Sequence, residues 1–300
     1  MSSLSRKSLP EGLSFEALFK PDREREYFLN AAEHPFRLEA SGFDACNAWW
    51  LAELSMLCYV REEELVGEIL GNAGISEVKI LEREGALCIV ADDMVAFRGT
   101  TDLRDVLRDI DAWLTPEGSA RVHRGFKKTL DPLWEALSTH IGDRPAWFTG
   151  HSMGAALATL AGNRHANTRA VYTFGSPRVG DSAYASNTKV PVYRVVNNND
   201  FVTRMPPPAS FRHIGTLHYL DSAGEMREEP GLADRLWSQV AGHGSRLVEN
   251  IRRWLAGEFD AIPYDSLVDH SPQHYVVHMW NHYASKSAGP AMDAPDPPSR

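Results

Sequence analysis

The sequence predicts an α/β fold with a mostly parallel central sheet and helices on both faces. Short apolar segments alternate with helix-like segments along the middle of the chain, and several of the short segments are apolar almost without interruption. Strands of a parallel sheet have this character because both of their faces are buried. At 300 residues, with 43% hydrophobic and 24% charged side chains, the chain is long enough to form one such core.

The individual elements follow in order. Asp44 precedes a stretch that is apolar nearly all round as far as Val60, which predicts a buried helix with a capping aspartate. Further helices are expected at 130–140 and 153–161. The expected strands are 77–84, 86–91, 94–97, 147–149, 170–174, 192–196 and 211–220. Strands that alternate with helices are typical of a mostly parallel sheet.

Three segments differ in composition from this core, which we expect to span residues 36–286. Residues 1–35 are polar and are expected to form a loosely attached lead-in. Residues 221–263 are charged and interrupted by glycines, with an amphipathic stretch at 247–255, and are interpreted as an insertion. Residues 287–300 contain four prolines and few apolar side chains, so a disordered tail is expected.

Charge and cysteine content exclude several classes of protein. The formal net charge of −9 gives no electrostatic basis for binding nucleic acid or an anionic membrane. No run of about 18 apolar residues occurs, and the first residues lack the apolar core of a secretory signal. Cys46, Cys58 and Cys88 are widely spaced, which favours buried free thiols. We therefore expect a cytoplasmic protein, with signal-less export as the alternative.

The strongest functional signal is Gly150-His151-Ser152-Met153-Gly154, which lies between a predicted strand and a predicted helix. A G-x-S-x-G sequence in this context forms a sharp turn that presents the serine hydroxyl at the end of a sheet. The following helix N-terminus favours developing negative charge. Ser152 is therefore the candidate nucleophile, with an ordinary tight turn as the alternative. His151 points the wrong way to act as base for its neighbour.

A nucleophilic serine needs a base and an orienting acid, and in a hydrolase sheet of this kind they follow it in the order acid, then histidine. Asp200 comes soon after the strand at 192–196, so it should lie at the same edge of the sheet as Ser152. Asp181 and Asp221 are the alternatives, although Asp181 follows a glycine-rich turn and is expected to cap a helix.

The base is harder to choose among twelve histidines. His270 lies in a loop just before Ser271-Pro272, which resembles a helix cap and first turn, and it is the first choice, with His274 as the alternative. His274, His278 and His282 would share one helix face. This stripe could bind a metal, but no carboxylate or thiolate joins it at useful spacing. We interpret it as a core or solvated stripe, and expect neither metal nor cofactor.

Six blocks of this sequence, in family order, resemble the class 3 lipases, the fungal-lipase-like family of α/β-hydrolases. The blocks are VAFRGT (95–100), VHRGF (122–126), GHSMGAALA (150–158), FGSPRVGD (174–181), NDFV (199–202) and DH (269–270). The resemblance implies an α/β-hydrolase fold and hydrolysis of acylglycerol-type esters by a triad of Ser152, Asp200 and His270. Ala155 departs from the usual family glycine, which affects helix packing and not the chemistry.

The oxyanion formed during ester cleavage needs hydrogen-bond donors. One is expected to be the backbone N–H of Met153, the residue after the nucleophile. The resemblance implies Thr100 as the second, and a lid in the segment that follows it. Residues 102–114 would then form a helix whose apolar face covers the acyl pocket; a fixed surface helix is the alternative. The tentative lid residues are Leu103, Leu107, Ile110 and Trp113.

The expected partner is an ester or lipid substrate at a lipid–water interface. The alternatives are a phospholipase A1-type acyl hydrolase, a carboxylesterase, a non-catalytic scaffold of the same fold and a metalloenzyme that uses the histidine stripe. Arg98 is expected to form a buried structural ion pair.

Overall fold

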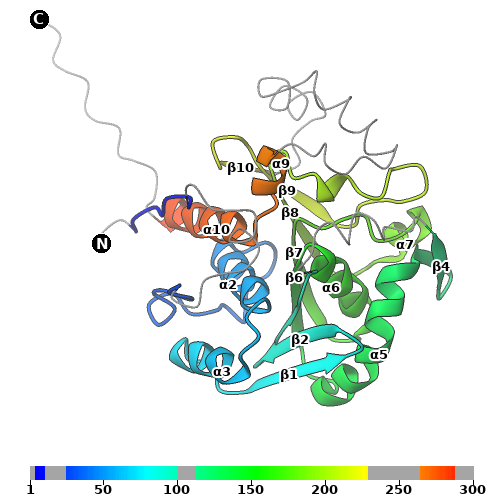
Figure 1. Cartoon of the computed structure of the whole chain (residues 1–300), viewed down its shortest axis with the longest axis horizontal. Coiled ribbons are helices and arrows are strands. Elements are labelled where there is room, and N and C mark those ends of the chain that lie inside the picture. Colours follow the sequence, from blue (N-terminus) through cyan, green and yellow to red (C-terminus); the bar gives the residue numbers. More distant parts are fainter. Residues whose placement is uncertain (1–3, 11–24, 101–112, 229–263, 288–300) are drawn as a thin grey trace, which may run out of the picture.

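The computed structural model describes residues 4–10, 25–100, 113–228 and 264–287. Its main feature is an eight-stranded sheet in the order β1-β2-β3-β6-β7-β8-β9-β10 (Figure 1). The neighbouring pairs from β3 to β9 are parallel, whereas β1, β2 and β10 pair antiparallel at the two edges. The strands are β1 (Val78–Arg83), β2 (Ala86–Ala91), β3 (Met94–Phe97), β6 (Ala146–His151), β7 (Thr168–Phe174), β8 (Val192–Asn197), β9 (Thr216–Leu220) and β10 (Met226–Glu228).

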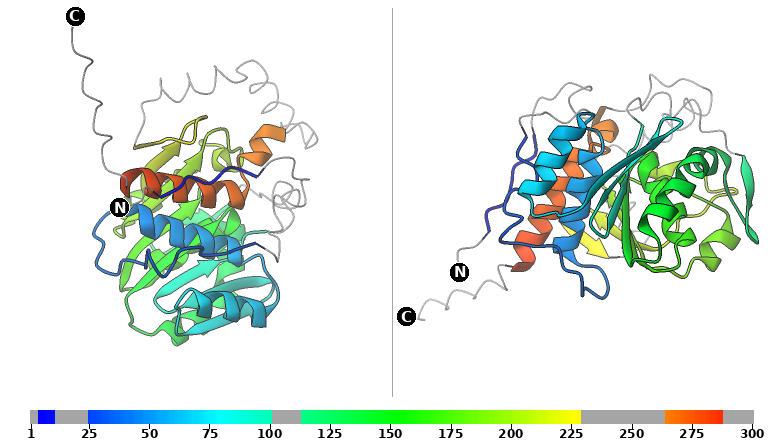
Figure 2. Two further views of the ribbon diagram at one scale, coloured as in Figure 1. Left: turned by 90° about the vertical axis from the view of Figure 1, so that its left-hand side faces the viewer. Right: turned by 90° about the horizontal axis from the view of Figure 1, so that it is seen from below.

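Helices cover both faces of the sheet (Figure 2). One face carries α2 (Ala45–Leu57), α3 (Glu63–Asn72) and α10 (Pro272–Ser287). The other carries α5 (Arg124–Ile141), α6 (Met153–Arg164) and α7 (Ser182–Asn187). The short helix α9 (Tyr264–Val268) precedes α10. The α/β-hydrolase fold and the mostly parallel sheet predicted from the sequence are therefore confirmed.

Strand β2 shows why the core strands are apolar throughout. Leu87, Ile89 and Ala91 belong to the core on the side of α2, whereas Ala86, Cys88 and Val90 belong to the core on the side of α5 and α6. Both sets are buried because each face of the sheet is covered.

The predicted helix after Asp44 is also confirmed. The Asp44 side chain accepts a hydrogen bond from the Asn47 N–H and caps α2. This helix lies between the sheet and α10, so nearly all of its side chains are buried. Its nearly continuous apolar character follows from that position.

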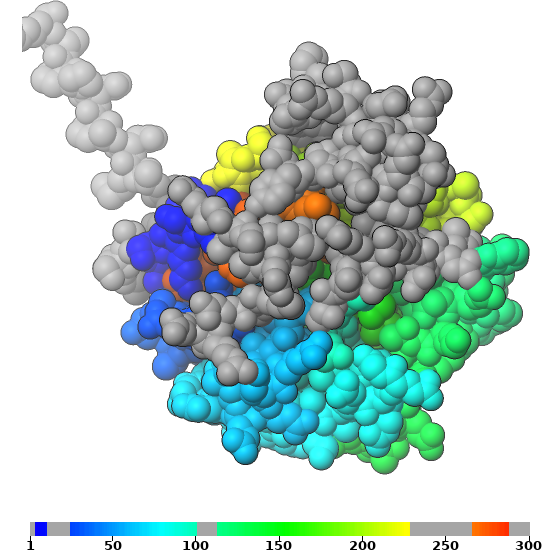
Figure 3. Space-filling view, in the orientation of Figure 1, coloured from blue at the N-terminus to red at the C-terminus, as the bar shows by residue number. Residues whose placement is uncertain are grey.

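The interpretation of residues 1–35 as loosely attached is wrong for the part that the structure describes. The Ser5 carbonyl accepts from Trp280 Nε1 at 3.0 Å, and the Lys7 backbone exchanges two hydrogen bonds with Asn281 at 2.7 and 2.9 Å. In the space-filling view residues 4–10, in dark blue, lie beside the visible atoms of α10 (Figure 3). Arg25 also reaches within 3.8 Å of Glu53, a buried carboxylate on α2. These contacts involve side chains of distant helices, which the local composition does not reveal.

The predicted insertion and strand at 211–263 also need correction. Strand β9 covers only residues 216–220, and β10 pairs with it from within the supposed insertion. Asp221 closes the turn between them by accepting from the N–H groups of Ala223 and Glu225. Residues 229–263, including the amphipathic stretch, lie outside the described residues.

The segment predicted as a lid is described only at its end. Leu103, Leu107 and Ile110 lie outside the described residues, whereas Trp113 is not helical and is 66% exposed. Leu114 begins an unpredicted hairpin of β4 (Leu114–Glu117) and β5 (Ala120–His123). A proline inside β4 weakens the strand signal of this short segment.

Helix α5 begins at Arg124, six residues before its predicted start. The His123 Nδ1 accepts from the Phe126 N–H and caps it, a role that sequence reasoning did not assign. At the other end of the chain, Ser287 is the last residue of α10 instead of the start of the tail, and 288–300 lie outside the described residues.

The three cysteines are buried and free, as predicted; the expected compartment stays a prediction. Among the described residues, no helix is long and apolar enough to cross a membrane.

Candidate active site

Ser152 lies at the carboxyl end of β6, in the turn that leads into α6. Its φ of 59° and ψ of −128° place it in a region that residues with a side chain rarely adopt. The two flanking glycines make this turn possible. A Cβ on Gly150 would overlap the backbone of Gly154, and a Cβ on Gly154 would overlap the carbonyl oxygen of Phe97 on β3. The backbone of the turn is thus packed so closely that only glycine fits at both positions.

The Ser152 side chain is buried, but its hydroxyl makes no hydrogen bond to the described residues. The residue is 2% exposed, and its N–H donates to the Phe174 carbonyl at 3.0 Å, which fixes the turn to the end of β7. Within the described part of the chain, Oγ has no hydrogen-bond partner. A buried hydroxyl that takes part in no structural bond is suited to a chemical role.

The structure brings Asp200 and His270 together. The His270 Nδ1 lies 2.8 Å from the Asp200 Oδ2, and both residues are 1% exposed. They meet over Gly175, which follows β7 directly and has a φ of 62°. A Cβ on Gly175 would lie 2.7 Å from Asp200 Oδ2 and 2.9 Å from His270 Nδ1, so glycine is required here. Because Phe174 also binds the Ser152 N–H, the three candidate residues converge on the end of β7.

The two alternative acids have other partners. Asp181 caps α7 by accepting from the Tyr184 N–H at 2.9 Å, which confirms its predicted capping role. Asp221 serves the β9–β10 turn described above. Asp200 instead accepts from the Val202 N–H through Oδ1 at 2.9 Å and from the Tyr275 hydroxyl through Oδ2 at 2.6 Å. Its carboxylate therefore has donors on both oxygens besides His270.

His151 connects His270, the candidate base, to Tyr59. Its Nε2 lies 2.7 Å from the His270 carbonyl oxygen, and its Nδ1 lies 2.9 Å from the Tyr59 hydroxyl. A carbonyl can only accept, so Nε2 donates and Nδ1 accepts the Tyr59 proton. Burial lowers the pKa of His151 well below 6.5, and the ring stays neutral. The Tyr59 oxygen accepts from the Gly99 N–H, beside Thr100.

The two expected oxyanion residues are also brought together. The Thr100 Oγ1 lies 3.4 Å from the Met153 Sδ. Gly154 packs against Phe97, the last residue of β3, which precedes Gly99 by two residues. Met153 is the first residue of α6, where backbone N–H groups have no partner within the helix. Arg98 faces away, toward the Gly85 carbonyl at 3.1 Å and Glu82 at 3.6 Å. Because the Glu82 side chain is 58% exposed, this ion pair is not the buried one that we expected.

The histidine stripe follows the candidate base along α10. His274 and His278 are buried, and burial lowers the pKa of each to about 4. They are therefore core histidines, in agreement with the first of the two interpretations. Asp200 contacts His270, and no contact of His274 with the acid is found among the described residues. No group of three potential metal ligands occurs in that part of the chain either.

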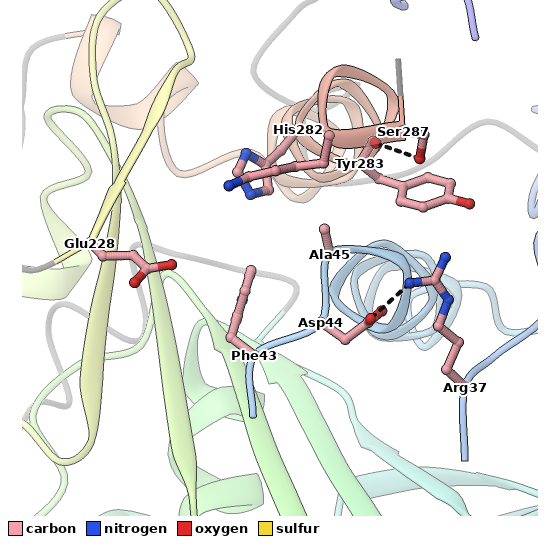
Figure 4. A pocket seen from close by; sticks show the side chains of 9 residues that line it. Arg37, Phe43, Asp44, Ala45, Glu228, His282, Tyr283 and Ser287 are labelled. Atoms are coloured by element: carbon pink, nitrogen blue, oxygen red, sulfur yellow. Dashed lines mark hydrogen bonds and ion pairs between the residues drawn. The ribbon is translucent and has the colours of Figure 1, made fainter. Parts of the chain in front are cut away.

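A separate pocket of about 410 Å³ lies at the other end of α10 (Figure 4). Its lining includes His282 and Lys286 from the last turns of that helix, and the Arg37–Asp44 ion pair of 2.9 Å. The 16 residues of α10 extend over about 24 Å, so this pocket is remote from His270 at the start of the helix.

Sequence reasoning missed Tyr59, Tyr275 and Gly175. Tyr59 lies just after α2 and Tyr275 lies within α10, both in apolar stretches of sequence where an aromatic residue is indistinguishable from ordinary core. Gly175 is part of one of the six quoted blocks, but its sequence context does not indicate that two side chains meet over it.

Residues 94–210 match the family described as Lipase (class 3). The match covers about two fifths of the chain, so the chain is similar to the class 3 lipases over this region. The matched region contains Thr100, Ser152 and Asp200, whereas His270 lies beyond it.

Curated relatives of this chain include several proteins named as lipases. A lipase of Rhizomucor miehei is 30% identical over 148 residues, which are 42% of this chain and 41% of that protein. A secreted mono- and diacylglycerol lipase of Fusarium solani is 29% identical over 119 residues, 37% of this chain and 33% of that one. The chain thus spans about a third to two fifths of the length of these curated relatives.

Solved structures of lipases show the same fold. A triacylglycerol lipase whose catalytic centre is described as a serine protease triad superposes with a TM-score of 0.52 at 24% identity, covering 62% of this chain and 84% of that one. A Rhizomucor miehei lipase–propeptide complex gives a TM-score of 0.52 at 21% identity, covering 63% and 70%.

Proposed function

We propose that this protein is a class 3 lipase-like serine hydrolase that cleaves acylglycerol-type carboxylic esters through an acyl-enzyme. The observation that carries the proposal is the convergence of three groups on the end of β7: the unpartnered Ser152 hydroxyl in a strained turn and the Asp200–His270 pair. Each group alone has structural explanations. A serine, a histidine and a buried carboxylate that converge in this order along a hydrolase sheet match the requirements of acyl transfer.

The reaction would proceed in two halves. In the first, His270 Nε2 takes the proton of Ser152 Oγ as that oxygen attacks the ester carbonyl carbon. The protonated imidazole then gives this proton to the departing alcohol, which leaves an acyl-serine. In the second half, His270 takes a proton from water as the water oxygen attacks the acyl carbon. The bond between that carbon and Ser152 Oγ then breaks, His270 returns the proton to Oγ, and the carboxylic acid leaves. No cofactor enters either half.

The surrounding residues would support these steps. Asp200 binds the Nδ1–H of His270 and thereby holds the tautomer in which Nε2 is the base. The N–H of Met153 and a donor of Thr100 would bind the oxyanion; one donor of this kind contributes about 100- to 1000-fold in rate. The lid stays a prediction. The Trp113 side chain at the end of this segment is exposed and would be available to contact a lipid surface.

The test is hydrolysis of p-nitrophenyl esters with acyl chains from C2 to C16 by the wild type and by Ser152→Ala. We expect the wild type to be active and the variant to lose at least about 1000-fold in kcat. A matched control is Ser55→Ala, because Ser55 is an equally buried serine whose hydroxyl donates to the Ala52 carbonyl, away from the site.

The chain-length optimum would then distinguish a lipase from a short-chain esterase, and release of fatty acid from phosphatidylcholine vesicles would indicate a phospholipase. A wild type that is inert on all of these esters would support the non-catalytic scaffold. A Ser152→Ala variant with full activity that chelators abolish would support the metalloenzyme.

A further inference from the structure

Tyr275 is a buried polar group beside the triad that the reaction above does not use. It lies on α10, five residues after His270, and is 1% exposed. Its hydroxyl is 2.6 Å from Asp200 Oδ2, the same oxygen that faces His270 Nδ1 at 2.8 Å. The Asn197 N–H lies 3.0 Å from the same hydroxyl.

The direction of these hydrogen bonds follows from the chemistry of the groups. An ionised carboxylate only accepts and a backbone N–H only donates, so the Tyr275 proton goes to Asp200 and its oxygen accepts from Asn197. Burial raises the pKa of Tyr275 well above 10, and the neighbouring charge of Asp200 raises it further. The phenol therefore keeps its proton and stays a donor.

Besides the direct contact of Asp200 with His270, the hydrogen bonds of Tyr275 join the segment that carries the acid to the segment that carries the base. Asp200 lies in the loop after β8, and Asn197 is the last residue of β8. His270 lies just before α10, and Tyr275 lies in the first turn of that helix. Further bonds join the same two segments, because the Asn197 side chain donates to the Asp269 carbonyl and the Asn199 N–H donates to the Asp269 carboxylate.

We propose that Tyr275 is a positioning residue of this lipase: its hydroxyl fixes Asp200 Oδ2 in line with His270 and reduces the negative charge that this oxygen presents to the imidazole. The assignment rests on the proposed function. The Val202 N–H holds the other carboxylate oxygen, so with Tyr275 in place the carboxylate cannot rotate away from the base. Without the hydroxyl, Oδ2 would lose a charged hydrogen bond and the buried Asn197 N–H would lose its acceptor.

The two effects make separable predictions for Tyr275→Phe. Poorer alignment should lower kcat by about 10- to 100-fold, the range of one hydrogen bond to a charged group, with KM changed by less than about twofold. The more negative Oδ2 should favour protonated His270. The acidic limb of the rate profile should therefore move to higher pH, by about half a pH unit. The other titratable groups beside His270 are the neutral His151, whose ring centroid is 4.5 Å away, and Asp269, which is bound by Asn198 and Asn199.

The experiment measures kcat, KM and the pH–rate profile for the wild type, Tyr275→Phe and Tyr283→Phe. Tyr283 is the matched control, since it is buried on the same helix and its hydroxyl bonds to His34 Nδ1 at 2.9 Å, away from the triad. Rates are expressed per active site, counted by stoichiometric labelling with a p-nitrophenyl phosphonate, so that misfolded protein does not contribute.

A lower kcat together with a shifted acidic limb in Tyr275→Phe alone is the expected result. A kcat per labelled site and a profile equal to those of the wild type would overturn the assignment and leave ester hydrolysis intact. A lower kcat with an unmoved profile would show a merely structural role and overturn it as well. A wild type that neither labels nor hydrolyses esters would instead overturn the proposed function, and this is seen before any tyrosine variant is made.

Discussion

The nucleophile side and the acid–base side of the candidate site are built in different ways. Ser152 is held by backbone geometry: a strained turn, glycines at 150 and 154, and the close approach of β3. Asp200 and His270 are held by side-chain hydrogen bonds from separate elements, among them those of Tyr275 and His151. Backbone packing of this kind tolerates almost no change of sequence at the glycines, whereas a network of side-chain bonds can be weakened one bond at a time.

The largest effect should therefore come from the backbone side. In Gly154→Ala the new methyl group would overlap the Phe97 carbonyl oxygen, so β3 and α6 must move apart. We expect the free energy of unfolding to fall by about 3 kcal/mol or more, with complete loss of esterase activity. Urea denaturation followed by circular dichroism measures the first quantity, and p-nitrophenyl butyrate hydrolysis the second.

Gly67→Ala is the control for this substitution. Gly67 lies within α3, and no atom lies within 4 Å of the position of its added Cβ. Alanine should stabilise the protein there by about 0.5–1 kcal/mol because it is the better helix former. A Gly154→Ala variant as stable as the wild type would show that the turn is less tightly packed than the structure indicates, and the contrast between the two sides would be lost.

The same contrast explains what could be predicted from the sequence. The strained turn leaves a local signature, since G-x-S-x-G between a strand and a helix specifies both the glycines and the serine. The order of strands identified Asp200, because acids at the carboxyl end of a neighbouring parallel strand must lie near Ser152. Tyr59 and Tyr275 leave no such signature. Their partners are 92 and 75 residues away, and only the folded chain brings them together.

The errors in the fold have a similar origin. Residues 4–10 are polar in composition, yet Trp280 and Asn281 on α10 supply partners for their backbone. Residues 25–35 are similar in this respect, since Trp50 on α2 donates to the His34 carbonyl. The β4–β5 hairpin was missed because Pro116 and a short strand give little periodicity. The helix cap at His123 was missed because histidine is not a preferred N-cap residue, although its Nδ1 can accept as a serine oxygen does.

Tyr59→Phe would test the connection between the two sides. The substitution removes the proton donor of His151 Nδ1 and the acceptor of the Gly99 N–H. Because His151 binds the His270 carbonyl, the base and the oxyanion turn should both lose alignment. We expect kcat to fall by about 3- to 10-fold with KM unchanged, an effect of about one neutral hydrogen bond.

Tyr172→Phe is the matched control for Tyr59→Phe, since its buried hydroxyl accepts from the Asp44 N–H at the cap of α2. It should cost some stability and leave kcat per active site unchanged. Equal rates for Tyr59→Phe and the wild type would show that the two sides of the site are aligned independently.

The smallest effect concerns the pH dependence of the helix that carries the acid–base side. Burial lowers the pKa of His274 to about 4, below its ordinary value of 6.5. Between these values the unfolded chain binds the proton and the folded chain does not. Stability is therefore complete above about pH 6.5 and is lost as the pH falls toward 4. Helix α6, on the nucleophile side, contains no residue that titrates in this window.

His274→Gln removes this titration while retaining a polar side chain, so the free energy of unfolding should fall less steeply with decreasing pH. We expect the slope to be smaller than that of the wild type by about 1 kcal/mol per pH unit between pH 6 and 5, since one proton per molecule sets the upper limit. Urea denaturation at several pH values measures it, with Tyr172→Phe as a control that should retain the wild-type slope, because the buried Tyr172 hydroxyl bonds to the backbone of Asp44 and Gly42. Identical slopes for His274→Gln and the wild type would mean that His274 is protonated in the folded protein, and the acid sensitivity of the fold would then have to be sought at His278 or His218, whose pKa values burial also lowers to about 4.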